Sequence, residues 1–340
     1  MRRFDYVNAP DLPTALELVS AGARPLGGGT NLVDLMRADV ERPETLVDLT
    51  RLPLTDVDEL PGGGLRIGAL VRNGHLAAHR LVRSRYPVLT QALLSGASGQ
   101  LRTMATVGGN LLQRTRCPYF RDRSADCNKR EPGSGCAAPG GVHRGAAVLG
   151  TSEHCIAAHP SDMAVALAAL DAVVEVESLR GIRRVPVAQL HRLPGDTPHV
   201  ETDLAPDELI TAVELPADPV ARTSRYRKVR DRASFAFALV SVAAVLDVRN
   251  GEVADVRLAL GGIAPRPWRA HEAERLLLGG PATEESFGRA AAAELAPAVG
   301  GPQNEFKIEL ARRVVVAVLR ELDTERSAAE RADDTEGGTS

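Results

Sequence analysis

All four cysteines of this 340-residue chain lie within one window of 39 residues, at Cys117, Cys127, Cys136 and Cys155. The same window is rich in proline and glycine, which prevents a regular helix or strand from forming there. A long irregular segment needs an internal link to be ordered, and clustered cysteines supply one when they bind a metal centre. The window therefore predicts a loop that is ordered by its cysteines.

The residues alone leave three states of these cysteines open: ligands of zinc, ligands of an iron–sulfur cluster, and free thiols. Two disulfides would suit a small secreted chain rather than this one, and no CxxC pair of a zinc finger is present. Between Gln113 and Gly150, seven Lys or Arg residues oppose three acidic residues, a net charge of +4. Because a 4Fe–4S core held by four thiolates is negatively charged, the basic loop favours the cluster.

Two glycine-rich turns could bind phosphate. The first, GGGTN at 27–31, follows an expected strand at 24–26 and precedes an expected helical turn at 32–37. The second, TVGGN at 106–110, also ends in Gly-Gly-Asn before apolar residues. Backbone N–H groups in such turns bind anions, and two loops could hold one pyrophosphate from two sides. Neither turn matches the dinucleotide fingerprint or the Walker loop, and each also fits an ordinary tight turn.

These segments resemble the FAD-binding (medium) subunits of the xanthine dehydrogenase and molybdenum hydroxylase family. The matching segments occur in family order at 26–36, 100–102, 106–111, 226–230, 234–243 and 260–267. The cysteine segments at 113–122, 127–130, 132–138 and 155–160 resemble the branch that carries an extra 4Fe–4S cluster. That branch includes bacterial periplasmic-type aldehyde oxidoreductases and hydroxybenzoyl-coenzyme A reductases. The sequences PGSGC at 132–136 and SDMA at 161–164 resemble the aldehyde oxidoreductases more than the hydroxybenzoyl-coenzyme A reductases.

The resemblance implies two cofactors, FAD and a 4Fe–4S cluster. The implied FAD contacts are Leu26, Gly27, Gly28, Gly29, Thr30, Asn31, Leu32, Thr106, Gly108, Gly109, Asn110, Asp162 and Lys228. The implied cluster ligands are Cys117, Cys127, Cys136 and Cys155. Lys228 would lie near the isoalloxazine edge, although its segment also fits a strand with a solvated basic face. Asp162 would lie near the ribityl or adenosine end, or could cap a helix together with Ser161. No catalytic residue is identified in this chain.

The resemblance also implies an α+β fold. A two-subdomain FAD-binding fold of the vanillyl-alcohol oxidase / p-cresol methylhydroxylase type would be followed by a C-terminal α+β domain with an antiparallel sheet and helices. The expected boundaries are 1–55 and 56–217 for the two subdomains, with the cysteine loop inserted at 113–156, and 220–323 for the C-terminal domain. Asn250-Gly251 predicts a hairpin turn between strands at 235–248 and 253–260. The segment 324–340 has no large apolar residue and is expected to be a disordered tail.

These implications lead to an electron-transfer subunit of a heterotrimeric molybdenum-dependent oxidoreductase that oxidises aldehydes to carboxylic acids. A partner 2Fe–2S small subunit would pass electrons to FAD and on to an external acceptor, and a molybdenum-cofactor large subunit would hold the substrate. Three alternatives are a self-standing FAD-dependent reductase that uses a nicotinamide nucleotide, a medium subunit of a hydroxybenzoyl-CoA reductase-like enzyme, and a zinc-stapled assembly module.

Charge and hydropathy set the expected surroundings of the chain. The net charge is −3 and no basic–aromatic patch occurs, so neither nucleic acid nor an anionic membrane is an expected partner. The longest stretch without a charge, 86–101, has 16 residues and is too short to span a bilayer. Because no apolar run follows the first arginines, the chain by itself is expected to be cytoplasmic. Export with a partner that carries a twin-arginine signal would place it in the periplasm.

Overall fold

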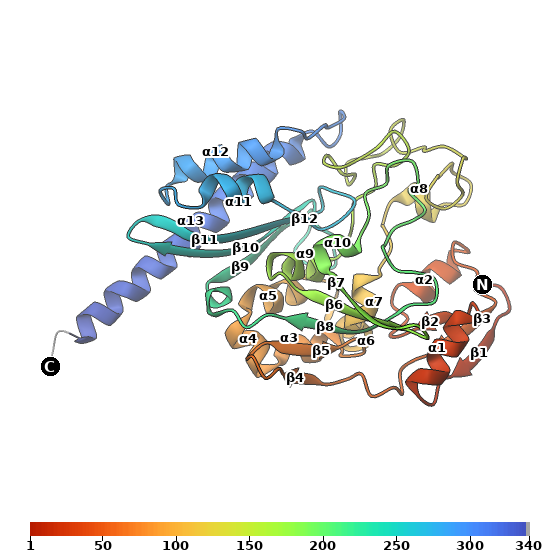
Figure 1. Ribbon diagram of the computed structural model, residues 1–340. Helices are drawn as coiled ribbons and strands as arrows, with labels where there is room; N and C mark the ends of the chain where they lie inside the picture. Colours follow the sequence, from red (N-terminus) through yellow and green to blue (C-terminus); the bar gives the residue numbers. More distant parts are fainter. Residues whose placement is uncertain (338–340) are drawn as a thin grey trace.

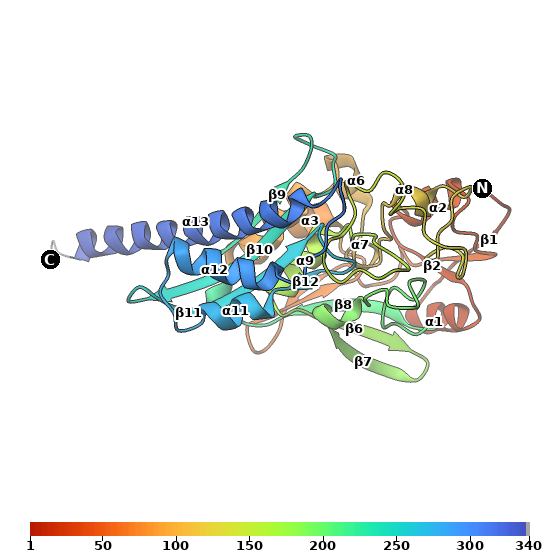
Figure 2. The same ribbon diagram turned by 90° about the horizontal axis from the view of Figure 1, so that it is seen from above.

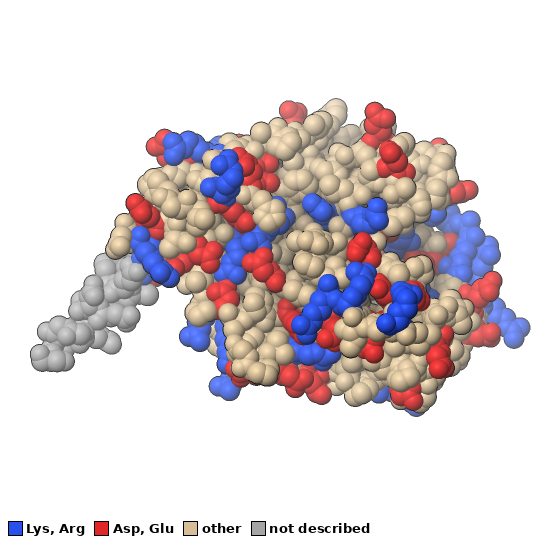
Figure 3. Space-filling view, in the orientation of Figure 1, with Lys and Arg blue, Asp and Glu red and all other residues tan. Residues whose placement is uncertain are grey.

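The computed structural model describes the backbone of residues 1–337 and the side chains of residues 1–326. Helices and three sheets alternate along this part of the chain (Figure 1), which confirms the prediction of a mixed helix-and-sheet fold. No helix within the described residues is long and apolar enough to cross a membrane. Positive and negative side chains are interspersed over the face in Figure 3 rather than gathered into one basic surface.

The first sheet is parallel, with strand order β1-β3-β2. Its elements are β1 (Asp5–Asn8), α1 (Leu12–Ser20), β2 (Arg24–Leu26), α2 (Leu32–Arg37) and β3 (Thr45–Asp48). Local signals explain α1: the Asp11 carboxylate accepts from the backbone N–H of Thr14 at 2.9 Å, and Leu16 and Val19 are buried. The strand at 24–26 and the turn of helix at 32–37 occur as predicted, so the first glycine loop joins a strand to a helix.

The second sheet is antiparallel, with order β4-β5-β8-β6-β7. Its strands are β4 (Val57–Glu59), β5 (Leu65–Gly68), β6 (Val173–Ser178), β7 (Gly181–Pro186) and β8 (Leu209–Leu215). The helices among them are α3 (Asn73–Ala78), α4 (Arg80–Arg85), α5 (Pro87–Ser95), α6 (Gly99–Met104), α7 (Val107–Leu111), α8 (Pro118–Arg121), α9 (Asp162–Ala169) and α10 (Val187–Leu190). Every residue of α9 is buried, so this helix lies at the centre of the main core.

The third sheet is antiparallel, with order β12-β11-β10-β9. Its elements are the short 3₁₀ turn η1 (Pro219–Arg222), β9 (Ser224–Val229), β10 (Val240–Arg249), β11 (Glu252–Gly261), β12 (Trp268–Arg269), α11 (His271–Leu277), α12 (Glu284–Leu295) and α13 (Phe306–Gly337). Along β10, Ala243 and Val245 join the core around α9, whereas Val242 and Ala244 pack with α11, α12 and α13 on the other face (Figure 2). The sheet therefore joins both halves of the molecule.

The predicted hairpin at Asn250-Gly251 is confirmed, because both residues have positive φ, +52° and +79°, between paired strands. The strand expected at 235–248 begins only at Val240. Residues 235–239 instead form a loop, in which Phe235 has φ of +51° and is more than half exposed. The alternating Phe-Ala-Phe-Ala sequence imitates a strand but belongs to this loop.

The C-terminal segment differs from the expectation of a disordered tail at 324–340. Helix α13 continues through Gly337, and residues 338–340 lie outside the described residues. Alanine, glutamate and arginine, which dominate this segment, are strong helix formers even without an apolar face. An ion pair between Glu325 and Arg225 of β9 also holds the first part of the segment against the sheet.

Candidate functional site

A pocket with a volume of about 980 Å³ lies where the three parts of the fold meet. Six of the thirteen residues expected to contact a cofactor line it: Thr30, Asn31, Gly109, Asn110, Asp162 and Lys228. The other seven do not belong to its lining: Leu26, Gly27, Gly28, Gly29, Leu32, Thr106 and Gly108. The pocket therefore collects the ends of both glycine loops, and most of the remaining loop residues pack behind its wall.

The two glycine loops touch one another. A Cβ atom on Gly28 would lie 1.9 Å from the carbonyl oxygen of Met104, and one on Gly27 would lie 2.8 Å from Oγ1 of Thr106. Real Cβ atoms do not approach backbone this closely, so only glycine allows the contact. The two loops are therefore neighbours in space, and their joint contact with one ligand stays a prediction.

The loops differ in the amide groups that they offer. In the described structure, none of the backbone N–H groups of 27–31 donates a hydrogen bond within the protein. In the second loop, by contrast, Gly108 donates to the Ala69 carbonyl at 2.8 Å and Gly109 to Oγ1 of Thr106 at 3.2 Å. The sequence led us to expect free donors in both loops, but in the second loop the N–H groups of residues 107–110 are occupied, because this loop is tied into α7 and the adjacent chain.

The asparagine at the end of each glycine loop bonds, through its side chain, to another segment of the pocket wall. Oδ1 of Asn31 accepts from the backbone N–H of Arg114 at 3.0 Å. Oδ1 of Asn110 accepts from the Ser161 hydroxyl at 2.6 Å and from the Gln113 amide at 2.7 Å. These bonds fix the loops against the cysteine-bearing insertion and against the start of α9, which forms the next part of the pocket wall.

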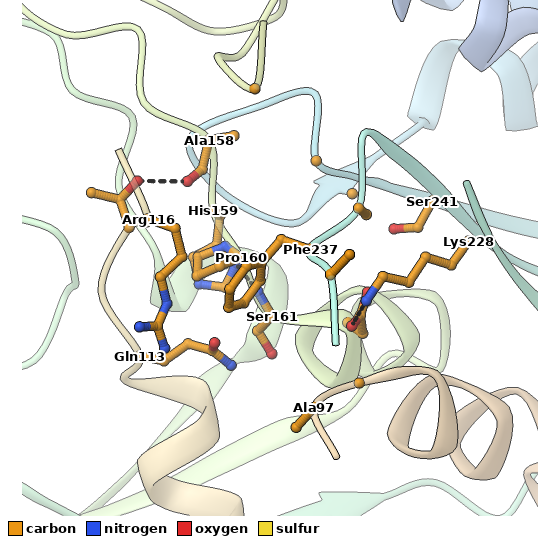
Figure 4. Close-up of a pocket in the computed structure, with 18 of the residues that line it drawn as sticks. Ala97, Gln113, Arg116, Ala158, His159, Pro160, Ser161, Lys228, Phe237 and Ser241 are labelled. Carbon is orange, nitrogen blue, oxygen red and sulfur yellow. Dashed lines mark hydrogen bonds and ion pairs between the residues drawn. The ribbon is translucent and has the colours of Figure 1, made fainter. Parts of the chain in front are cut away.

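Asp162 and Lys228 form a buried ion pair at the pocket, with Nζ and Oδ2 2.7 Å apart (Figure 4). The Tyr226 hydroxyl donates to the other carboxylate oxygen, and Lys228 also donates to the Ser95 carbonyl at 3.2 Å. Burial, together with the charge of Asp162, raises the pKa of Tyr226 well above its ordinary value. The helix cap belongs to Ser161, whose hydroxyl accepts from the Ala164 N–H at 3.0 Å, and Asp162 is the first helical residue.

Sequence reasoning did not identify Arg116, His159 and Phe237 as site residues, yet all three line the pocket and lie together in Figure 4. The guanidinium of Arg116 lies 4.9 Å from the centre of the Phe237 ring and 3.1 Å from the Asp34 carboxylate. Burial lowers the pKa of Arg116. Arg116 comes from the cysteine insertion, His159 from the segment just after it, and Phe237 from the loop that had the pattern of a strand, so no local pattern pointed to the pocket.

The ring of His159 packs edge-on against His191, with centroids 4.2 Å apart. His191 contacts the carbonyl oxygen of Leu111, at the end of α7, through Nε2 at 2.8 Å. Burial lowers the pKa of His159 well below its ordinary value and that of His191 to about 4. Both imidazoles are therefore neutral at physiological pH and carry no charge into the pocket.

The pocket lining is positively charged. It contains five basic residues, Arg102, Arg116, Arg144, Lys228 and Arg232, and three acidic residues, Asp34, Asp162 and Asp231. The resulting charge of +2 favours an anionic ligand, because potentials focus inside a cleft with low-dielectric walls. Thr30 and Asn31, whose backbone N–H groups donate to no protein acceptor in the described structure, belong to this lining.

The four cysteines line a second, much smaller pocket, together with Lys129 and His154. Burial raises the pKa of Cys117, and it raises that of Cys155 to about 11, with the other cysteines adding to both shifts. A cationic metal centre would be needed to hold these thiols as thiolates at neutral pH. The two pockets share three lining residues, Cys117, Ala138 and Ala157, so they lie on opposite sides of one wall.

The arrangement of the cysteines bears on the kind of metal centre they could hold. Among the described residues, no three His, Cys, Asp or Glu side chains are placed to hold a single metal ion. Mononuclear zinc needs every sulfur about 2.3 Å from one point. In a 4Fe–4S cluster each thiolate binds a different iron, so the sulfurs stand further apart around a common space. The four cysteines share one small pocket in the described structure.

Comparison with known proteins adds sequence relationships to this geometry. Residues 2–218 match the family described as "FAD binding domain in molybdopterin dehydrogenase", and residues 224–322 match "CO dehydrogenase flavoprotein C-terminal domain". The aldehyde oxidoreductase FAD-binding subunit PaoB of Escherichia coli is 51% identical over 94% of this chain and 98% of its own length. The glyceraldehyde dehydrogenase medium chain of Sulfolobus acidocaldarius is 27% identical, over 93% of this chain and 95% of the relative.

Solved structures share the fold at lower identity. Quinoline 2-oxidoreductase from Pseudomonas putida matches with a TM-score of 0.73 and 22% identity, over 95% of this chain and 98% of that chain. Reconstituted CO dehydrogenase from Oligotropha carboxidovorans matches with a TM-score of 0.73 and 22% identity, over 94% and 97% of the two chains. At this identity the likeness establishes the arrangement of the elements.

Proposed function

This chain belongs to the family of FAD-binding domains of molybdopterin dehydrogenases, and we propose that it is the FAD-carrying electron-transfer subunit of a molybdenum-dependent aldehyde oxidoreductase. The pocket carries the proposal, because a cavity of about 980 Å³ with a +2 lining and a loop of free N–H groups suits a large dianionic cofactor. The substrate class is supported by the names of two relatives, an aldehyde oxidoreductase subunit and a glyceraldehyde dehydrogenase chain.

The first glycine loop would bind the pyrophosphate of FAD. Its N–H groups at 27–31 are free, whereas those of the second loop are occupied, so the second loop would support the first and present Gly109 and Asn110 to the cofactor. Leu26, Leu32, Thr106 and Gly108 do not line the pocket and would then support the two loops rather than contact the cofactor. Bound FAD supplies the exchange of electrons between donors and acceptors of different kinds. The buried pair Asp162–Lys228 would orient the flavin end of the cofactor, with Tyr226 holding the carboxylate in place.

We further propose that Cys117, Cys127, Cys136 and Cys155 bind a 4Fe–4S cluster. Their common pocket and the basic loop around them support this assignment. This chain would then carry two cofactors on either side of one wall.

The chain would work with two partners, a 2Fe–2S small subunit and a molybdenum-cofactor large subunit that holds the substrate. The relatives support this, since their names describe FAD-binding subunits or medium chains. We also propose the boundaries 1–55, 56–217 and 220–323, with a vanillyl-alcohol oxidase-type arrangement of the first two parts. The separate sheets within 5–48, 57–215 and 224–269 support these boundaries. A partner with an export signal would decide the compartment.

An anaerobic absorption spectrum of the purified chain, with iron, zinc and acid-labile sulfide assays, tests both cofactors. The proposal expects flavin bands and about four irons and four sulfides per chain. Flavin with stoichiometric zinc would contradict the cluster and favour a self-standing flavin reductase, which reduction by a nicotinamide nucleotide would reveal. Folded protein with no flavin would contradict the proposed function. Co-expression with the partner genes would then separate the two alternatives: aldehydes should bleach the flavin of an aldehyde oxidoreductase, whereas an aromatic hydroxyacyl-CoA should reoxidise the reduced flavin of the acyl-CoA reductase alternative.

A further inference from the structure

Lysine is rare in this chain and is confined to buried positions. The sequence has 38 arginines but only three lysines, Lys129, Lys228 and Lys307. Their side chains are 10%, 3% and 0% exposed. Lysine presents a compact point charge, whereas arginine needs room for a planar fork. Each lysine therefore occupies a place where a small buried cation is required.

Two of the three lysines have acidic partners, and the third does not. Lys129 pairs with Glu201 at 3.3 Å and Lys228 with Asp162 at 2.7 Å. Lys307 is paired with no carboxylate among the residues whose side chains the structure describes. Its ammonium instead donates to three carbonyl oxygens, those of Gly145 at 3.3 Å, Ala146 at 2.8 Å and Gly262 at 2.6 Å.

The position of Lys307 is costly for a cation in three ways. Burial and the nearby Arg144 lower the pKa of Lys307 to about 7, so the surroundings disfavour its charge. Lys307 lies in the first turn of α13, at the positive end of the helix dipole, where a cation is unfavourable. A buried charge without a counter-ion needs compensation from elsewhere. An anionic ligand in the adjoining pocket would provide it.

The three carbonyl partners of Lys307 all belong to residues that line the pocket. The sheet register places one of these residues, Gly262, near Lys228. Lys228 on β9 is paired with Ser241 on β10, and Ser241 is paired with Gly261 on β11. Gly262 is the next residue after Gly261. Neighbouring strands lie about 4.8 Å apart, so the Gly262 wall stands roughly two strand spacings from Lys228. The Lys307 ammonium therefore lies behind the end of the pocket that contains Lys228, and away from the first glycine loop.

We propose that Lys307 is a positioning residue for the flavin, whose buried ammonium raises the electrostatic potential in this end of the pocket and stabilises the reduced flavin. The inference rests on the proposed function, since it requires FAD in the pocket. Two-electron reduction with uptake of one proton leaves the flavin ring with one negative charge. The electrons come from the aldehyde oxidised on the partner subunit, or from dithionite in a titration. The reduced ring then provides the counter-charge that Lys307 lacks within the protein.

The test is the flavin reduction potential of the full-length chain, measured by dithionite titration against a reference dye. Lys307→Met removes the charge at similar volume, and Lys307→Gln removes it but keeps a donor for the carbonyls. Arg312→Met is the matched control, because it removes one positive charge from an exposed position on the same helix. Both Lys307 variants are expected to shift the redox equilibrium at least tenfold towards oxidised flavin, about 30 mV for a two-electron couple, with FAD content unchanged. The control is expected to keep the wild-type potential.

Each other outcome overturns the inference in a distinguishable way. If the Lys307 variants bind flavin and keep the wild-type reduction potential, Lys307 contributes to packing alone. Folded variants that lose FAD would assign it to binding of the cofactor rather than to its reduced form. If neither variant folds while the control does, Lys307 serves the fold by joining α13 to the insertion and to the Gly262 turn. Absence of flavin from the wild-type chain would instead refute the proposed function, before the variants are compared.

Discussion

The buried pair of Asp162 and Lys228 gives the sharpest stability prediction. Replacing Lys228 by Met leaves the Asp162 carboxylate, 9% exposed as a side chain, with the Tyr226 hydroxyl as its remaining side-chain partner. Removing one member of a buried pair costs about 3–5 kcal/mol, because the other charge stays desolvated. Substituting both members, in Lys228→Met/Asp162→Leu, leaves no orphaned charge and should cost far less, because replacing a buried pair by apolar residues of similar volume is often neutral or stabilising. The double variant is therefore expected to be more stable than the single lysine variant.

The assay is urea unfolding of the full-length chain, followed by far-UV circular dichroism in a fixed excess of FAD so that flavin occupancy is equal. The four proteins of the cycle are wild type, Lys228→Met, Asp162→Leu and the double variant. We expect a coupling free energy of at least about 2 kcal/mol between the two positions. Additive losses below about 1 kcal/mol each would refute the reasoning, since they would mean that water, rather than Lys228, compensates the Asp162 charge.

Three further predictions concern the loops, the histidine pair and the cysteines. Gly28→Ala places a Cβ atom 1.9 Å from the Met104 carbonyl oxygen, so the affinity for FAD should fall at least tenfold in a fluorescence titration. Gly62→Ala is the control, because no atom lies near its Cβ position, and it should leave the affinity unchanged. The pKa of His191 is about 4 in the folded chain and 6.5 in the unfolded chain, so the unfolded chain binds more protons between these pH values. This difference should lower the free energy of unfolding of the wild type by about 3 kcal/mol from pH 6.5 to 4. Urea unfolding of His191→Gln over the same pH range should lack this loss, and an unchanged pH profile would contradict the prediction. Cys136→Ser should lower iron content while FAD is retained, and unchanged iron would exclude that ligand.

Where a feature is set by neighbours in the chain, the sequence was enough to predict it. The strand and turn around the first glycine loop and the Asn250-Gly251 hairpin both depend on residues a few positions apart. The loop at 235–239 was mistaken for a strand because alternation describes side-chain spacing but not backbone conformation. Its positive φ at Phe235 is a backbone conformation to which the alternation pattern gives no clue.

The site was predictable in its parts but not in its connections. Motif resemblance named Asp162 and Lys228 separately, and their pairing follows from the packing of α9 against β10 and from the pairing of β10 with β9, far apart in sequence. The same limit applied to the glycine loops. Both have the composition of a phosphate-binding turn, and only their surroundings show that the amides of 27–31 are free while those of Gly108 and Gly109 are occupied.

The wall between the two pockets makes the cysteine insertion part of the flavin site rather than an appendage to it. Cys117, Ala138 and Ala157 line both cavities, and Arg116, one position before Cys117, reaches across to Phe237. A centre that fixes the cysteines would therefore fix one side of the larger pocket, and a cofactor in the larger pocket would hold the insertion against the third sheet. If each cofactor binds the ordered wall, each stabilises the state that the other needs. Two cofactor sites that share a wall in this way are expected to stabilise one another.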